Sequence, residues 1–317
     1  MKELFIGEVI KRRREELGLS QEKLCEGICE PITLSRFESG KNIPAHNRVK
    51  ALLQRLNLPD NRYYALLSKH ELKLNSIRAE LLSCTTRFEC APIDKAKQLW
   101  TLAMEQLQEL EMLVEEDDRI TRQFILSHRA TLGREDGPYP LRERLAILLD
   151  ALHLTAPNFD LEYIGARRYT VDETRIINQI AGTFSYAEDH EKALAIYRQL
   201  FEYVYKNDDQ LSNFAPHLTL IAYNYTRELA LCKYYHEAIQ AAEKGLQVSV
   251  NYFYYQFLPG FLALLGECYY MMGEEKASRE RYLQAHYLYE VLEDQKSLSI
   301  IDSDIRERFG IEFSNQQ

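Results

Sequence analysis

The chain has 317 residues, more than one hydrophobic core usually accommodates, so at least two regions are expected. Its formal net charge is −9, but residues 1–69 carry thirteen Lys or Arg against nine Asp or Glu, whereas the rest carries twenty-six against thirty-nine. The charge therefore confines any nucleic-acid contact to the N-terminal end, because phosphate binding needs only local positive charge. No run of eighteen apolar residues is present, which argues against a membrane partner.

The first expected helix spans residues 6–17, where apolar side chains recur at helical spacing around a basic run. Ser20 is a good N-cap for a second helix that should end near Ile28. A short third helix is expected over residues 31–39, with Pro31 in its first turn and Gly40 as the left-handed residue that closes it. A fourth helix follows and stops before Pro59.

The third helix carries the candidate residues for reading DNA bases. Its spacing turns Leu34 and Phe37 inward and leaves Ile32, Thr33 and Arg36 outward, with Ser35 at the margin. Arginine in the middle of a recognition helix is the commonest reader of guanine, so Arg36 is the foremost of these.

Beyond residue 60 the chain is predicted to be helical throughout, and it repeats. Three segments each place two small residues twelve positions apart, which lets the two helices of a hairpin pack closely as in tetratricopeptide (TPR) repeats. The pairs are Ala181 and Ala193, Thr226 and Ala238, and Gly266 and Ser278. Two weaker hairpins are expected around residues 71–114 and 118–152, and a last helix at residues 297–308 should cap the array.

The fold class is therefore all-α: an N-terminal helix-turn-helix followed by a right-handed solenoid of TPR-like hairpins. We expect a DNA-binding domain at residues 1–60, a linker helix and first solenoid helix at 61–90, and a repeat domain for ligand binding and dimerisation at 91–317.

The first helices of the hairpins should form a concave wall suited to an extended peptide. Asparagine can donate to and accept from a peptide backbone at once, and arginine suits a carboxylate. The candidate peptide contacts on this wall are Arg175, Asn178, Tyr223, Asn224 and Arg227. A solvated helix surface is the alternative interpretation for each of them.

Two other functions compete with this one. An enzyme is not supported, because the sequence has no nucleophile with a base, no glycine-rich phosphate loop and no metal-ligand spacing, and no cofactor is expected. The six cysteines, at positions 25, 29, 84, 90, 232 and 268, form no Cys-x-x-Cys pair and indicate a reducing, cytoplasmic location. The stronger alternative is a regulator whose repeats bind a protein partner and not a free peptide.

Residues 6–58 resemble the helix-turn-helix of phage-repressor-like (XRE/Cro type) regulators, through Ser20-Gln21, Leu34, Glu38 and Gly40-Lys41. The resemblance implies that Gln21 contacts a phosphate, that Arg36 and Thr33 reach bases, and that Lys41 with Asn42 holds the DNA backbone. It also implies a structural pair between Arg14 and Glu38. The chain departs from the common pattern at Pro31 and Ile32, where polar readers are frequent.

Together with the repeats, the whole chain resembles the RRNPP family of Gram-positive quorum-sensing receptors, of the PlcR, PrgX and Rgg type. The local signal runs from Leu24-Cys25 through Gly27-Ile28-Cys29 into the third helix. The resemblance implies a cytoplasmic homodimer that binds a palindromic operator on double-stranded DNA and is regulated by a short signalling peptide. It also implies asparagines on the inner face, which we assign to Asn178 and Asn224.

Overall fold

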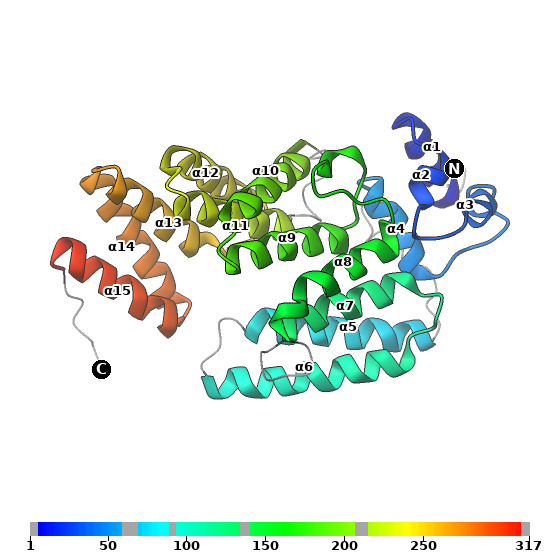
Figure 1. The fold of residues 1–317 in the computed structure, drawn as a ribbon, viewed down its shortest axis with the longest axis horizontal. Helices are drawn as coiled ribbons and strands as arrows, with labels where there is room; N and C mark the ends of the chain where they lie inside the picture. The colour runs from blue at the N-terminus through cyan, green and yellow to red at the C-terminus, as the bar shows by residue number, and fades with distance from the viewer. Residues whose placement is uncertain (1–5, 59–68, 89–92, 134–139, 207–214, 312–317) are drawn as a thin grey trace. The chain divides into compact units, whose positions relative to one another are not determined.

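The computed structural model describes residues 6–58, 69–88, 93–133, 140–206 and 215–311, and every regular element in these ranges is helical (Figure 1). The chain divides into two compact units, residues 1–183 and 184–317. The first unit contains α1 (Ile6–Glu16), α2 (Gln21–Cys25), α3 (Pro31–Glu38), α4 (His46–Arg55), α5 (Lys69–Phe88), α6 (Ile93–Leu113), α7 (Arg119–Leu132), η1 (Leu141–Glu143), α8 (Arg144–Thr155), η2 (Ile164–Ala166) and most of α9 (Val171–Tyr186).

Helices α1 to α4 form a small bundle, here called the head, around a core of fully buried side chains that includes Ile10, Leu34 and Leu52. Ser20 caps α2 by accepting a hydrogen bond from the backbone N–H of Lys23 at 3.2 Å. The third helix begins and ends within one residue of its predicted bounds. The head therefore has the expected order of helices.

The predicted end of the second helix was wrong. Helix α2 ends at Cys25, three residues before Ile28, because Glu26 leaves the helical conformation with a ψ of 121° and Gly27 continues the turn with a φ of +71°. The turn is held by two hydrogen bonds to the carbonyl of Cys25, from the N–H groups of Ile28 at 2.9 Å and Cys29 at 3.1 Å.

Behind the head, α5 packs on α6 and α7 packs on α8, so the two weaker hairpins are confirmed. Helices α5, α6 and α7 share an apolar core that includes Leu81, Leu107 and Phe124. Trp100 packs against the same core and donates its indole N–H to the carbonyl of Leu132 at 3.0 Å.

The second unit contains α10 (His190–Lys206), α11 (Ala215–Leu231), α12 (Tyr235–Asn251), α13 (Leu258–Met271), α14 (Glu275–Val291) and α15 (Gln295–Phe309). Each helix packs on the next along the chain from α10 to α15. All of the small residues predicted at the close approaches are buried. At one of them the hydroxyl of Ser278 donates to the carbonyl of Gly266 at 2.7 Å.

Tyr282 shows why a small residue is required at that contact. A Cβ added to Gly266 would lie 2.7 Å from the ring of Tyr282, which is itself 1% exposed.

The tight turns between the helices also repeat, with left-handed residues at Glu188, Lys233 and Gly273, 45 and 40 positions apart. These intervals are those of the repeats themselves, and the packing of α11 on α12 and of α13 on α14 confirms two of the three predicted hairpins.

Helix α15 matches the predicted terminal helix and is anchored by Arg308. Its guanidinium hydrogen-bonds the hydroxyl of Tyr282 and forms an ion pair with Glu267, each at 2.5 Å. Among the helices that the structure describes, none combines the length and apolar character needed to cross a bilayer.

Candidate functional site

The outward face of α3 is open to solvent. Leu34 and Phe37 are fully buried, whereas Arg36 is exposed and Thr33 and Ser35 are half-buried, which is the predicted arrangement. Ile32 is 60% exposed and lies one helical turn before Arg36, on the same face. The helix therefore offers a charged and an apolar side chain to the same surface; their contacts with bases remain a prediction.

The Arg14–Glu38 pair fixes α3 in the head. The Arg14 Nε and Nη2 atoms donate to the two carboxylate oxygens of Glu38 at 2.6 and 2.9 Å, and its Nη1 donates to the carbonyl of Leu19 at 2.9 Å. Both side chains are buried, and the hydrogen bonds to Glu38 raise the pKa of Arg14. The structure thus confirms this pair.

Gln21 is drawn into the same cluster. Its Nε2 donates to Glu38 Oε2 at 2.6 Å. An amide nitrogen carries two N–H donors, so the second of them is the group that a phosphate would accept from. The phosphate contact of Gln21 stays a prediction, and the hydrogen bond to Glu38 would orient the amide for it.

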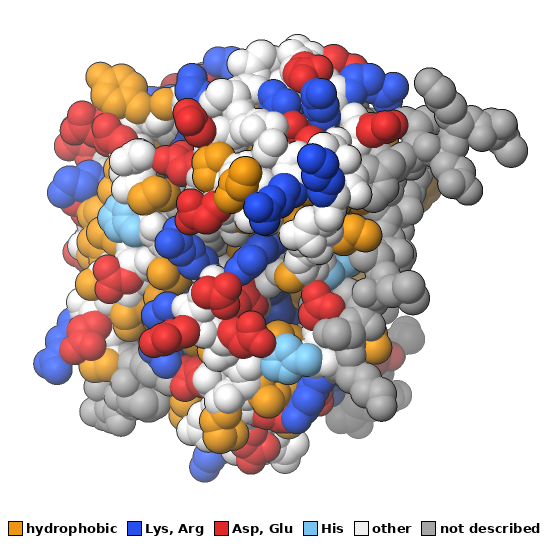
Figure 2. Space-filling model, turned by 90° about the vertical axis from the view of Figure 1, so that its right-hand side faces the viewer, with side chains coloured by type: hydrophobic (Ala, Val, Ile, Leu, Met, Phe, Trp, Pro, Cys, Tyr) orange, Lys and Arg blue, Asp and Glu red, His pale blue; other side chains and the backbone are white. Residues whose placement is uncertain are grey.

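The loop after α3 places Lys41 and Asn42 in exposed positions, and Gly40 has a φ of +74°. The backbone N–H of Lys41 donates to the carbonyl of Arg36 at 2.8 Å, which ties the loop to the end of α3. Figure 2 is turned toward the side on which Figure 1 draws α1 to α3, and it shows basic side chains interspersed with acidic ones. Among the described residues of this face, positive charge is thus offered at separate points.

In the first unit, the two candidate peptide contacts on α9 are less accessible than expected. Arg175 has a side chain 15% exposed and forms an ion pair with Asp172 at 3.2 Å. Asn178 is only 6% exposed. Arg175 keeps a small part of its side chain at the surface, whereas a backbone clamp by Asn178 would require movement of its surroundings.

In the second unit, Tyr223, Asn224 and Arg227 share the α11 helix. The ring of Tyr223 stacks on Phe257 at 5.3 Å between centroids and meets Phe261 edge-on at 5.8 Å, so it packs against the start of α13. Asn224 is half-buried and Arg227 is exposed. Of the five candidates, Arg227 is thus the most accessible, and the peptide role of each remains a prediction.

Two residues that matter for the head were missed in the sequence: Arg55 and Glu173, which form a buried ion pair at 2.9 Å. A signal was present. Arg55 stands among the apolar positions of the fourth helix, and Glu173 lies three and four residues before Ile176 and Ile177. A charged residue on an apolar stripe is rarely buried without a partner, so each should have suggested one.

Residues 10–61 match the helix-turn-helix family of proteins, which identifies the head as a DNA-binding domain of this type. Curated proteins give no match to the chain in sequence. Solved structures do share its fold over nearly the whole length.

PlcR from Bacillus thuringiensis, in complex with the peptide PapR7 and DNA, is 19% identical with a TM-score of 0.56, covering 94% of this chain and 98% of PlcR. The apo competence regulator ComR from Streptococcus vestibularis is 16% identical with a TM-score of 0.54, covering 96% and 98%. The same ComR in complex with its signalling peptide XIP is 16% identical with a TM-score of 0.50, again covering 96% and 98%.

Proposed function

We propose that this protein is a cytoplasmic transcription regulator whose TPR-like helices bind a short signalling peptide and thereby alter its binding to operator DNA. It would act as a homodimer on a palindromic site, with one head in each half-site. A ligand can change DNA binding only if it binds one arrangement of the protein more tightly than another, so peptide binding must be coupled to the placement of the heads.

The observation that carries the DNA part is the open face of α3. Its inward residues are fully buried, the Arg14–Glu38 pair fixes its end, and Arg36 and Ile32 project outward. Arginine pairs with guanine O6 and N7, and an aliphatic side chain can contact the methyl group of thymine. The head is therefore suited to reading a guanine and a neighbouring thymine in the major groove.

The peptide part is supported by the shared fold. PlcR was crystallised with a peptide and DNA, and ComR with a signalling peptide, and this chain covers both over almost their full length. Stacked helical hairpins present long surfaces on which an extended peptide can lie. Asn224 and the exposed Arg227 on α11 supply the groups that a peptide backbone and a carboxylate require.

A protein partner is the second candidate, and exposed apolar side chains in the second unit favour it. Phe253, in the turn between α12 and α13, is 78% exposed with a φ of +58°, and Val250 and Tyr255, close to it in the sequence, are 53% and 46% exposed. Apolar side chains grouped on a surface are typical of protein contacts. Phe253→Ser should leave peptide binding intact if the peptide proposal is correct.

The test is a selection of DNA duplexes from a random pool by the full chain, followed by anisotropy titrations with the selected duplex. We expect a palindromic consensus, tight binding by the wild type, and loss of sequence preference in Arg36→Ala. Calorimetry with short synthetic peptides encoded beside the gene then tests ligand binding. Failure to enrich any sequence, or equal sequence preference in Arg36→Ala, would count against the DNA proposal.

A further inference from the structure

Arg55, in the last turn of α4, joins the head to the helices behind it through four hydrogen bonds. Its Nη1 donates to the carbonyls of Leu24 and Glu26 at 2.9 and 2.6 Å, at the end of α2. Its Nη2 donates to the carbonyl of Thr155 at 3.0 Å and to the carboxylate of Glu173 at 2.9 Å. One guanidinium, 1% exposed, thus links the ends of α2 and α8 with the first turn of α9.

Glu173 accepts two further hydrogen bonds besides the one from Arg55. Its Oε1 accepts from the hydroxyl of Thr155 at 2.7 Å, and its Oε2 accepts from the backbone N–H of Thr170 at 2.6 Å. Burial opposes ionisation of this carboxyl, but Arg55, Arg167 and the hydrogen bonds outweigh it and lower its pKa. The pair is therefore charged at neutral pH, and neither partner can leave without exposing the other to an apolar interior.

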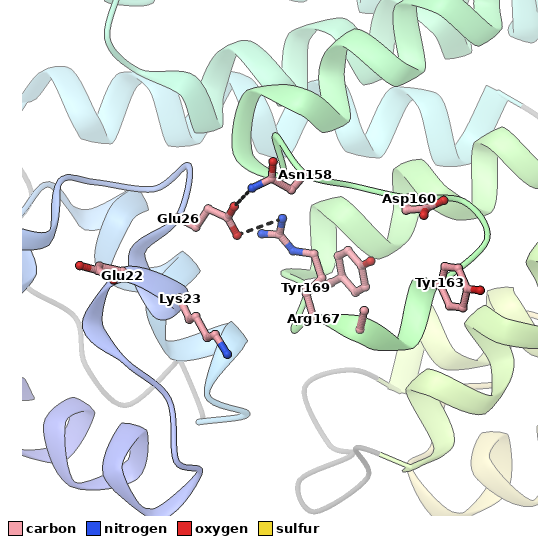
Figure 3. Close-up of a pocket in the computed structure, with 9 residues that line it drawn as sticks. Glu22, Lys23, Glu26, Asn158, Asp160, Tyr163, Arg167 and Tyr169 are labelled. Atoms are coloured by element: carbon pink, nitrogen blue, oxygen red, sulfur yellow. Dashed lines mark hydrogen bonds and ion pairs between the residues drawn. The ribbon is translucent and has the colours of Figure 1, made fainter.

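A second set of contacts surrounds the same junction. Glu26, beside the end of α2, accepts from Asn158 at 2.7 Å and pairs with Arg167 at 3.3 Å; both partners come from the segment between α8 and α9 (Figure 3). A hollow of about 470 Å³ lies beside these residues. Gly27 brings the turn of the head so close to α8 that an added Cβ would lie 2.1 Å from the carbonyl oxygen of Thr155.

The position of the junction matters for function. Within the part of the chain that the structure describes, the side chains of Arg55 and Glu173 hydrogen-bond to each other, to α2, to the end of α8 and to Thr170 just before α9, while Arg36 on α3 stays exposed. Glu173 lies in the first turn of α9. The same helix also carries Arg175 and Asn178 and continues to Tyr186. The junction thus attaches a candidate ligand helix to the face of the head that does not read DNA.

We propose that the Arg55–Glu173 pair is a positioning device that couples α9 to the orientation of the DNA-reading head. A displacement of the first turn of α9 must carry α2 and α4 with it, or else leave a buried guanidinium without its carboxylate. Packed interfaces of this kind switch between discrete arrangements and do not deform continuously, so a break here would release the head as a unit. The inference rests on the proposed function, because the ligand is expected to act through α9.

A purely stabilising role is a weaker explanation for this pair. Buried ion pairs can often be replaced by apolar residues without loss of stability, whereas they are well suited to specifying one arrangement over another. The four carbonyl and carboxylate acceptors of Arg55 come from three separate parts of the chain, so the pair specifies how those parts meet.

Hydrogen exchange of the full chain tests the coupling without knowledge of the ligand. Glu173→Gln keeps the shape of the side chain and removes its charge. We expect exchange in residues 20–28 and at the end of α4 to accelerate at least tenfold, and exchange in α11 to stay as in the wild type. Glu267→Gln, the same chemical change at an ion pair with Arg308 in the second unit, should leave the head unchanged.

DNA binding supplies the functional readout. With a duplex selected by the wild type, Glu173→Gln should lower the affinity at least fivefold, because the head loses its fixed orientation, while Glu267→Gln should bind normally. Unchanged exchange in the head, or equal acceleration over the whole chain, would overturn the inference. If Glu173→Gln does not fold, Thr155→Val removes the hydrogen bond to Glu173 together with the one that Gln123 donates to the same hydroxyl at 2.6 Å, and it should give the same pattern more weakly. Uniform exchange in that variant would also overturn the inference.

The two proposals fail in different ways. A wild type that selects no duplex refutes the proposed function and leaves the exchange experiment to judge the coupling. A wild type that binds DNA while Glu173→Gln binds equally well, with an unchanged head, refutes only the coupling.

Discussion

Replacing Gly27 with alanine should destabilise the first unit more than the same change at Gly18. Both glycines are left-handed, with φ of +71° and +64°. A residue with a Cβ costs about 1–2 kcal/mol in this conformation. Their surroundings differ: the new Cβ meets nothing within 4 Å at Gly18, but at Gly27 it lies 2.1 Å from the carbonyl oxygen of Thr155.

The difference can be estimated from these contacts. A clash with a backbone atom cannot be relieved by rotating a side chain, so either the turn after α2 or the end of α8 must move. Overpacking of this kind costs about 1–3 kcal/mol. The expected loss is therefore roughly 2–5 kcal/mol for Gly27→Ala, against about 1–2 kcal/mol for Gly18→Ala.

Pulsed hydrogen exchange during urea unfolding measures this directly, because it reports the midpoint of the head separately from that of the second unit. Gly27→Ala should unfold the head at a clearly lower urea concentration than Gly18→Ala, with the second unit unaffected. Equal midpoints for the two variants would show that the turn does not approach α8 as described, and would remove one support of the junction.

Four further results are expected. Arg36→Ala should weaken binding to the selected duplex by about 1–3 kcal/mol while its melting curve stays that of the wild type; an unchanged affinity would remove Arg36 from the site. Glu38→Ala leaves a buried guanidinium unpaired and should lower the free energy of unfolding by about 3–5 kcal/mol, measured by urea titration; a loss below about 1 kcal/mol would contradict the buried pair. Burial lowers the pKa of His128 from 6.5 to about 4, so the folded state favours the neutral imidazole and is fully stabilised by it above pH 6.5. The free energy of unfolding should therefore fall by about 3 kcal/mol as the pH drops from 6.5 to 4. His128→Gln should flatten this part of the pH profile, and an unaltered slope would refute the assignment. Asn224→Ala combined with Arg227→Ala should weaken peptide binding in calorimetry, and equal affinity would exclude α11 from the peptide site.

Local patterns in the sequence were enough to predict much of the fold. The small residues twelve positions apart, such as Gly266 and Ser278, report a contact between adjacent helices, and the structure has that contact. The third helix of the head was predicted because Pro31 and Gly40 mark its two ends. In each case the residues that decide the structure lie close together in the chain.

The junction behind the head could not be predicted in the same way. Arg55 and Glu173 are separated by 118 positions, and a single sequence does not show which distant charges meet. The burial of Asn178 was missed for a related reason: helical periodicity shows which residues share a face, but what covers that face depends on the packing of other helices. The early end of α2 depends on the backbone conformation of the turn at Gly27. The sequence did not reveal it, because the residues up to Ile28 still fit a helical pattern.

We propose that a peptide bound by the helical repeats changes how the head binds DNA. Its most direct test is a fluorescence-anisotropy titration of the selected duplex with the full chain, alone and with each short synthetic peptide encoded beside the gene. We expect at least one peptide to shift the Kd for the duplex by fivefold or more, and we expect Glu173→Gln to abolish the shift. A peptide that binds the protein tightly in calorimetry and leaves the Kd for DNA unchanged would contradict it.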